Sequence, residues 1–293
     1  MKLRHALFAL LLTLPFAGPA RAVPPPIAGV THGELAQPGS VKRSYRLFVP
    51  QGLAPGKAAP LVIAMHGGLG TGDIFAKQTG FDAVAQQYGF VVAYPDGLGK
   101  VFNAGRCCGN AQANDVAFVR ALVADLKTRL PIDAKRVYGM GFSNGAMLAH
   151  RVACEAPEVF AAIAPVAGGI MVESCPSKTP VSALLIQGRL DQRIPWEGGA
   201  FDGTPRPSMA EVVQSIATRG QCCSEVKVLS DTPTAQCWSR SCKTGAQLQW
   251  CGLPTVGHQW AGGATYFPLL LGPNTADFDT SAKIGAFFTQ LPR

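Results

Sequence analysis

The stretch Gly141–Gly145, with the sequence GFSNG, lies near the middle of the chain and follows the pattern G-x-S-x-G. Residues 136–141 predict a strand, and residues 144–154 have the spacing of a helix. The two glycines carry no Cβ, so a strand and a helix can pass close to the turn between them. The stretch therefore predicts a tight strand-turn-helix junction with Ser143 at its tip.

Short apolar segments alternate with helical ones along the rest of the chain. Strands are predicted at residues 44–49, 61–65, 90–93, 136–141, 161–166, 181–186 and 247–251, and helices at 75–88, 114–130, 144–154, 208–218 and 280–289. Residues 23–39, rich in Pro and Gly, predict an irregular lead-in. Strands that are apolar throughout are typical of a parallel sheet covered on both sides. We therefore expect an α/β fold, with a mostly parallel central sheet and helices on both faces.

The composition is that of a folded protein with a large core. Of the 293 residues, 47% are hydrophobic and 15% are charged, which excludes a disordered chain. The formal net charge is +8, but the Lys and Arg residues are scattered along the sequence. A scattered charge favours a solvated basic surface, so no nucleic-acid partner is expected.

The first residues resemble an export signal. Lys2 and Arg4 are followed by an apolar run at residues 6–14, and residues 20–22 (ARA) fit a cleavage site. We expect residues 1–22 to be a signal peptide and residues 23–293 to form a single domain in the periplasm or outside the cell. An uncleaved anchor or a buried N-terminal helix is the alternative. The apolar run is too short to span a bilayer, and no membrane span is predicted.

The chain has nine cysteines, and export favours disulfides over a metal site. The adjacent pairs at residues 107–108 and 222–223 lack the spacing of zinc ligands, so no metal is predicted. Cys154 and Cys175 flank one predicted strand and could form a bridge. The odd number leaves at least one cysteine unpaired or bonded to another chain.

A serine hydroxyl needs a general base to act as a nucleophile at neutral pH. Among the histidines, His258 alone combines a late position, a Gly-containing loop and a preceding strand. His66 ends a buried strand and His150 lies within the helix after Ser143, so both are interpreted as structural. His258 is therefore the predicted base for Ser143.

The acid that orients the base should follow a strand between Ser143 and His258. Asp191 does so, because it comes directly after the predicted strand at residues 181–186. Glu173, Glu197 and Asp202 are the competing carboxylates. The alternative for Asp191 is a turn-capping role without catalysis.

A tetrahedral intermediate needs two N–H donors for its oxyanion. The amide of Asn144, directly after Ser143, is the first predicted donor. The second is expected from residues 66–69 (HGGL), with Gly68 preferred and Leu69 next. The alternative is a Gly-rich turn with no catalytic role.

Further motifs are spread over most of the chain. They are residues 65–67 (MHG), 94–97 (YPDG), 103–109 (NAGRCCG), 115–118 (DVAF), 141–146 (GFSNGA), 161–168 (AAIAPVAG) and 257–260 (GHQW). Together they resemble the secreted polyhydroxybutyrate depolymerase and feruloyl esterase family of α/β-hydrolases. The resemblance implies the α/β-hydrolase fold and the same catalytic residues, Ser143, Asp191 and His258.

The chain departs from that family at two aromatic positions. Phe102 stands where the family often has Trp, and Trp260 is followed by Ala261 rather than by Pro. We expect Phe102 and Trp260 to line the substrate pocket, with plain packing as the alternative.

The expected activity is that of a secreted serine carboxylic-ester hydrolase working through an acyl-enzyme without a cofactor. The expected substrates are small or polymeric esters, either feruloyl or other aryl esters or short-chain hydroxyalkanoate esters. A peptidase or other acyl hydrolase on the same scaffold is the first alternative. A secreted binding protein that has lost catalysis is the second.

Overall fold

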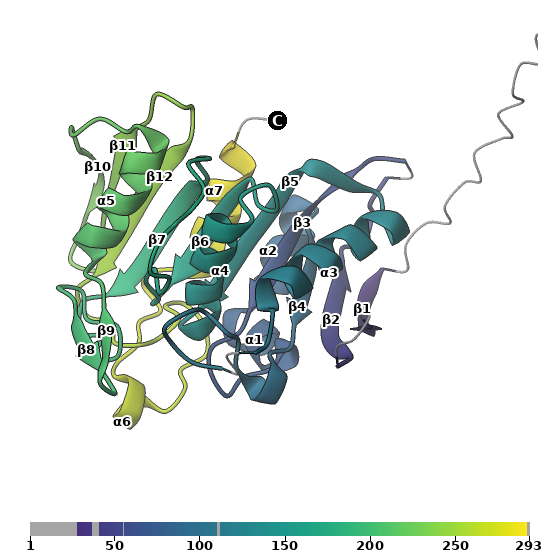
Figure 1. Cartoon of the computed structure of the whole chain (residues 1–293), viewed down its shortest axis with the longest axis horizontal. Coiled ribbons are helices and arrows are strands. Elements are labelled where there is room, and N and C mark those ends of the chain that lie inside the picture. Colours follow the sequence, from purple (N-terminus) through teal and green to yellow (C-terminus); the bar gives the residue numbers. More distant parts are fainter. Residues whose placement is uncertain (1–27, 37–40, 55, 110–111, 292–293) are drawn as a thin grey trace, which may run out of the picture.

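The computed structural model describes residues 28–36, 41–54, 56–109 and 112–291. A ten-stranded sheet runs through this part of the chain (Figure 1). The predicted signal peptide, residues 1–22, lies outside the described residues. In spatial order the strands are β1 (Gly29–Leu35), β2 (Arg43–Val49), β4 (Val91–Pro95), β3 (Ala59–Met65), β5 (Ile132–Phe142), β6 (Ala162–Val166), β7 (Ser182–Gly188), β12 (Gln247–Leu253), β11 (Gln236–Ser241) and β10 (Lys227–Asp231).

The middle of the sheet is parallel and its two edges are antiparallel. The strands from β4 to β12 in this order run parallel to one another, whereas β1 and β2 at one edge and β11 and β10 at the other pair antiparallel. A small separate hairpin is formed by β8 (Gly199–Phe201) and β9 (Thr204–Arg206). The predicted α/β class, with a mostly parallel central sheet, is confirmed.

Helices cover both faces of this sheet. Those on one face are α3 (Asp115–Arg129), α4 (Asn144–Glu155) and α5 (Met209–Gly220), and those on the other are α1 (Gly72–Thr79), α2 (Phe81–Tyr88) and α7 (Thr280–Gln290). Strand β3 shows why its sequence is apolar throughout. Leu61, Ile63 and Met65 pack into the first layer, while Val62 and Ala64 pack into the second. Both faces of the strand are thus removed from water.

Two sequence-based expectations are wrong. Residues 29–35 form the edge strand β1 rather than an irregular lead-in, and most of this strand's side chains stay outside the core. The helix expected at residues 75–88 is two helices, because Gly80 adopts a left-handed conformation (φ 61°) between them. Glycine takes up that conformation without steric cost, and it ends α1 as a C-cap.

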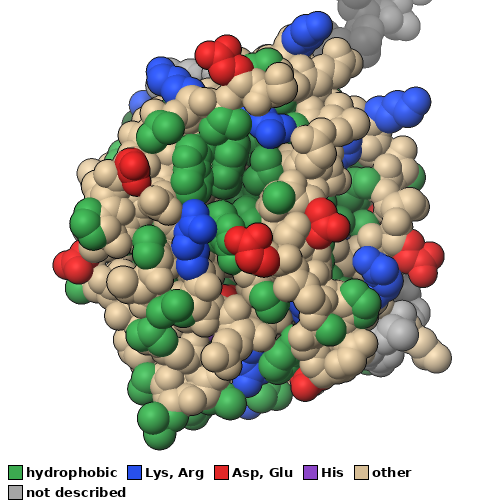
Figure 2. All heavy atoms as spheres, turned by 90° about the vertical axis from the view of Figure 1, so that its left-hand side faces the viewer, with side chains coloured by type: hydrophobic (Ala, Val, Ile, Leu, Met, Phe, Trp, Pro, Cys, Tyr) green, Lys and Arg blue, Asp and Glu red, His purple; other side chains and the backbone are tan. Residues whose placement is uncertain are grey.

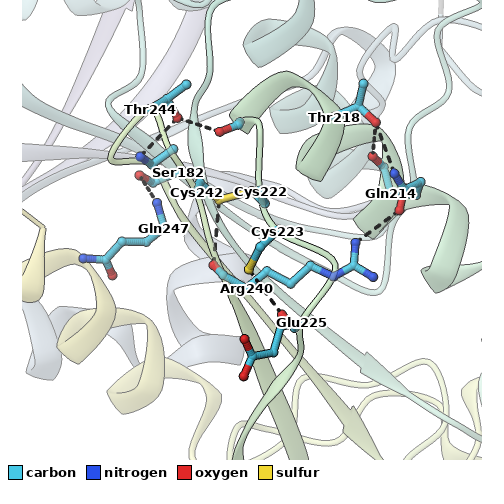
Figure 3. The surroundings of a disulfide bond; sticks show 12 residues. Ser182, Gln214, Thr218, Cys222, Cys223, Glu225, Arg240, Cys242, Thr244 and Gln247 are labelled. Carbon is cyan, nitrogen blue, oxygen red and sulfur yellow. Dashed lines mark hydrogen bonds between the residues drawn. A yellow bond between two sulfur atoms is a disulfide. The ribbon is translucent and has the colours of Figure 1, made fainter.

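Four disulfides link cysteines within the described residues: Cys107–Cys108, Cys154–Cys175, Cys222–Cys242 and Cys237–Cys251. The predicted Cys154–Cys175 bridge is confirmed, and it ties α4 to the loop before β7. Cys222–Cys242 joins the end of α5 to the end of β11, next to the free and exposed Cys223 (Figure 3). Two of the four bridges, Cys222–Cys242 and Cys237–Cys251, thus lie in the Cys-rich part of the protein formed by the end of α5, β11 and β12.

Charged side chains lie apart on the face shown in Figure 2. There, Lys and Arg side chains are interspersed with Asp and Glu instead of forming one basic band. Among the residues that the structure describes, no helix has both the length and the hydropathy needed to cross a bilayer.

The Cys154–Cys175 bridge closes a loop between residues separated by 21 positions. The double variant Cys154→Ala/Cys175→Ala should lower the free energy of unfolding by about 3 kcal/mol, because the unfolded chain gains conformational freedom. Urea unfolding followed by circular dichroism measures this change. Cys223→Ser, which removes only the exposed free thiol, is the control, and equal stability of both variants would contradict a structural bridge.

Candidate active site

Ser143 occupies a tight turn between β5 and α4, as the sequence predicted. Its backbone has φ 51° and ψ −116°, a strained conformation for any residue other than glycine. A Cβ on Gly141 would lie 2.4 Å from the backbone of Gly145, and one on Gly145 would lie 2.1 Å from the carbonyl oxygen of Met65. Strand, helix and turn therefore approach so closely that only glycine fits at both positions.

The Ser143 side chain meets the ring of His258. The distance from Ser143 Oγ to His258 Nε2 is 2.8 Å, and that from His258 Nδ1 to Asp191 Oδ2 is 2.7 Å. An ionised carboxylate only accepts hydrogen bonds, so Nδ1 carries the ring proton and Nε2 accepts from the serine hydroxyl. This is the arrangement in which an imidazole can remove the serine proton.

Asp191 is fixed by its own loop. Its Oδ1 accepts hydrogen bonds from the backbone N–H groups of Arg193 and Ile194, both at 2.8 Å, which leaves Oδ2 for His258. Asp191 and His258 are both almost completely buried. Among the described residues, none of the competing carboxylates, Glu173, Glu197 and Asp202, bonds to His258. The structure thus brings together the three residues that the sequence selected.

The loop after β3 passes beside Ser143 and is held by His66. His66 Nδ1 donates to the carbonyl of Gly67 at 2.7 Å, and Nε2 accepts from the N–H of Gly97 at 3.0 Å. Burial lowers the pKa of His66, which keeps the ring neutral in this role. His66 thus connects two loops at the end of the sheet.

The two predicted oxyanion donors lie at the same hollow as Ser143. Gly68 and Asn144 both line it. The N–H of Leu69, the second choice, already donates to the carbonyl of Lys100 at 2.8 Å. The N–H of Gly68 has no acceptor within the part of the protein that the structure describes. Of these two neighbours, Gly68 is therefore the one whose N–H is available to a ligand.

The hollow over Ser143 has a volume of about 430 Å³. Residues from five parts of the sequence line it: Gly67, Gly68, Leu69, Val101, Cys107, Cys108, Phe142, Ser143, Asn144, Met147, Arg193, Ile194, Phe201, Asp202, Thr204, Arg206, His258 and Leu271. Part of its wall comes from the β8–β9 hairpin, which the sequence did not predict. Only the position of this segment shortly after Asp191 could have pointed to it.

Phe102 and Trp260 do not line this hollow, which corrects the expectation that they contact substrate. Both side chains are completely buried. Phe102 packs near His66 with 4.5 Å between ring centroids, and its backbone N–H and C=O bond to the Asn144 side chain. Trp260 packs edge-on against Phe75 and donates its indole N–H to Ser281 Oγ at 3.0 Å. Both residues therefore pack against neighbours of the site, Phe102 against His66 and Trp260 against Phe142.

The described residues contain no group of three or more His, Cys, Asp or Glu side chains placed to hold a metal ion.

A parallel sheet with helices on both faces, carrying a serine on a tight strand-to-helix turn beside a late-loop histidine, defines an α/β-hydrolase. Residues 43–220 match the family described as esterase PHB depolymerase, and the chain belongs to that family. The family membership inferred from the motifs is thus confirmed.

Individual relatives are distant in sequence. Feruloyl esterase B of Piromyces equi is 29% identical over 224 residues, which are 71% of this chain and 41% of that protein. Feruloyl esterase C of Emericella nidulans is 31% identical over 163 residues, covering 54% of this chain and 58% of the relative. The match thus spans less than two thirds of each of these relatives.

A solved structure agrees on the fold. Acetyl xylan esterase from Aspergillus awamori superposes with a TM-score of 0.58 at 18% identity, covering 78% of this chain and 94% of that one. At this identity the likeness shows the α/β fold alone.

His150 lies on α4, two turns beyond Ser143, and does not line the hollow. It is buried, and neither ring nitrogen makes a hydrogen bond of good geometry among the described residues, although the backbone of Gly168 lies close enough to oppose the lowering of its pKa. Burial, assisted by the nearby positive charge of Arg219, lowers the pKa of His150 to about 3. The imidazole is therefore a neutral packing group, in line with the structural interpretation from sequence.

This lowered pKa predicts acid sensitivity. Between pH 6.5, the ordinary pKa, and about 3, the unfolded chain binds a proton at His150 that the folded protein does not. Folding stability should therefore fall as the pH drops through this range, by about 1.4 kcal/mol per pH unit for this residue. His150→Leu should weaken the loss of stability between pH 6 and pH 5 in urea unfolding. Substitution of the exposed His32 by Gln is the control, and an unchanged pH dependence in His150→Leu would contradict the assignment.

Proposed function

We propose that the protein is a carboxylic-ester hydrolase that acts through an acyl-enzyme formed on Ser143. The observation that carries this proposal is the 2.8 Å contact between Ser143 Oγ and His258 Nε2, with Asp191 on the opposite ring nitrogen. Membership of a family of esterases supports the ester as the bond that is cleaved.

The reaction uses the three side chains in sequence. His258 takes the hydroxyl proton as Ser143 attacks the ester carbonyl, and Asp191 stabilises the imidazolium. The amides of Asn144 and Gly68 hold the oxyanion, and His258 then protonates the leaving alcohol. Water, activated by the same imidazole, releases the acid from Ser143. The protein's own groups carry each of these steps.

The proposed substrates are feruloyl or other aryl esters, or short-chain hydroxyalkanoate esters. Relatives named feruloyl esterase support the first class, and the name of the family supports the second. The hollow of about 430 Å³ has the size of a site for a small ligand or one end of a polymer.

We further propose that residues 1–22 are removed on export, and that residues 23–293 work as one catalytic domain in the periplasm or outside the cell. The four disulfides support this location, because such bonds persist in oxidising compartments.

Ser143→Ala should lower kcat on p-nitrophenyl butyrate at least about 10⁴-fold, because the nucleophile is lost. The melting temperature should change little, because the substitution removes only one hydroxyl oxygen. Labelling with a fluorophosphonate should occur in the unaltered protein and be absent in the variant. A protein that neither hydrolyses esters nor takes up the label would be a binding protein, and faster cleavage of the matching anilide than of the ester would indicate a peptidase.

Two variants at residue 68 test the oxyanion donor. Gly68→Pro removes the N–H and should lower kcat about 10²- to 10³-fold, the usual effect of losing one such donor. Gly68→Ala keeps the N–H and places its Cβ in open space, so most of the activity should remain. Melting temperatures check that both variants fold. Equal activity of the two folded variants would remove Gly68 from the mechanism.

A further inference from the structure

Three arginines in the described part of the protein are at least nine-tenths buried: Arg43, Arg46 and Arg206. Arg43 is paired with Asp115 at 2.7 Å, and Arg46 with Asp82, where Nη1 lies 3.1 Å from Oδ1. Among the described residues, Arg206 has no carboxylate within ion-pair distance. A buried charge without a partner is unfavourable, because it has lost its hydration. Arg206 is therefore the exception among the three.

The contacts of the Arg206 guanidinium are weak. Nη1 lies 3.5 Å from the carbonyl of Thr204, Nη2 lies 3.6 Å from Sγ of Cys107, and Nε is buried without a hydrogen-bond partner in the described structure. Burial lowers the pKa of Arg206, and the negative charge of Asp202 acts in the opposite direction. Asp202 is exposed and makes no ion pair with Arg206. The donor capacity of this guanidinium is thus largely unused.

Arg206 stands in the wall of the hollow that contains Ser143. It belongs to β9, and it lines this hollow together with Ser143. Arg193 lines the same hollow, with its guanidinium 4.8 Å from the ring centroid of Phe201 and no ion pair to any described residue. The titratable groups of the hollow besides His258 are thus two arginines and the exposed Asp202, so a bound anion meets a net positive wall.

We propose that Arg206 binds a carboxylate of the substrate, so that the preferred esters carry a free acid group in addition to the ester that is cleaved. A planar guanidinium matches a carboxylate with two parallel hydrogen bonds. Apolar side chains such as Val101, Met147 and Ile194 line the rest of the hollow and suit an aliphatic linker between the two groups. This inference rests on the proposed function. Of the two substrate classes proposed above, it favours hydroxyalkanoate oligomers with a free acid end over neutral feruloyl esters.

Matched pairs of esters test the proposal. Mono-p-nitrophenyl adipate is compared with its methyl ester for an acid on the acyl side, and the linear dimer of 3-hydroxybutyrate with its methyl ester for an acid on the alcohol side. In at least one pair, the free acid should have the higher kcat/KM by about tenfold to a hundredfold, as expected for a charge-assisted pair, and mainly through a lower KM.

Arg206→Gln should bring that ratio close to one, and Arg206→Lys should keep part of it. Arg219→Gln is the matched control. Arg219 is also partly buried, has an unpartnered Nε among the described residues and contacts a cysteine sulfur, but does not line the hollow. The ratio of kcat/KM for the free acid to that for the methyl ester should be the same in Arg219→Gln as in the unaltered protein. Melting temperatures identify any variant that fails to fold. The ratio of kcat/KM values measured on the unaltered protein tests the proposal even if a variant does not fold.

Hydrolysis of both members of each pair at equal rates would overturn the carboxylate site and leave the esterase proposal intact. A preference for the free acid that persists in folded Arg206→Gln would likewise overturn the role of Arg206. Absence of hydrolysis of all four esters and of p-nitrophenyl butyrate would instead reject the proposed function itself.

Discussion

The close approach of three backbone segments at Ser143 is the constraint on which the site depends. The end of β3, the end of β5 and the first turn of α4 meet so tightly that Gly145 would carry its Cβ 2.1 Å from the Met65 carbonyl. This contact sets the serine above the sheet and also brings the loop with Gly68 beside it. The core on both sides of β3 and β5 holds the backbone in its strained conformation, because the apolar strands pack between two layers of helices.

The central sheet could be predicted because its strands have a local apolar pattern. Ser143, Asp191 and His258 could be predicted from the motif around Ser143 and from their order along the chain. An apolar run such as residues 61–65 requires burial on both faces, and the order of Ser143, Asp191 and His258 follows that of strand ends in this fold. The edges could not be predicted in the same way. Strand β1 keeps most of its side chains outside the core, so its sequence lacks an apolar pattern, and Gly80 divides a segment whose helical spacing continues on both sides.

The wall of the hollow was also beyond prediction from sequence, for a different reason. Phe102 and Trp260 adjoin the site in the sequence, yet their large apolar surfaces are better placed in the core. The wall of the hollow is instead built by Arg193, the β8–β9 hairpin and the Cys107–Cys108 pair, which meet only through tertiary packing. The residues of the proposed site could thus be found from sequence, whereas the shape of the hollow depends on segments without a recognisable pattern.

The way in which Asn144 holds Phe102 has a consequence for how the site can change over evolution. The Asn144 side chain accepts from the backbone N–H of Phe102 at 2.7 Å and donates to its backbone carbonyl at 2.9 Å, a pair of groups that every residue except proline offers. The register of the loop is therefore independent of the side chain at position 102. A substitution at position 102 would change the packing against His66 but would preserve the backbone bonds to Asn144. The serine turn thus holds this loop through the backbone of residue 102 alone.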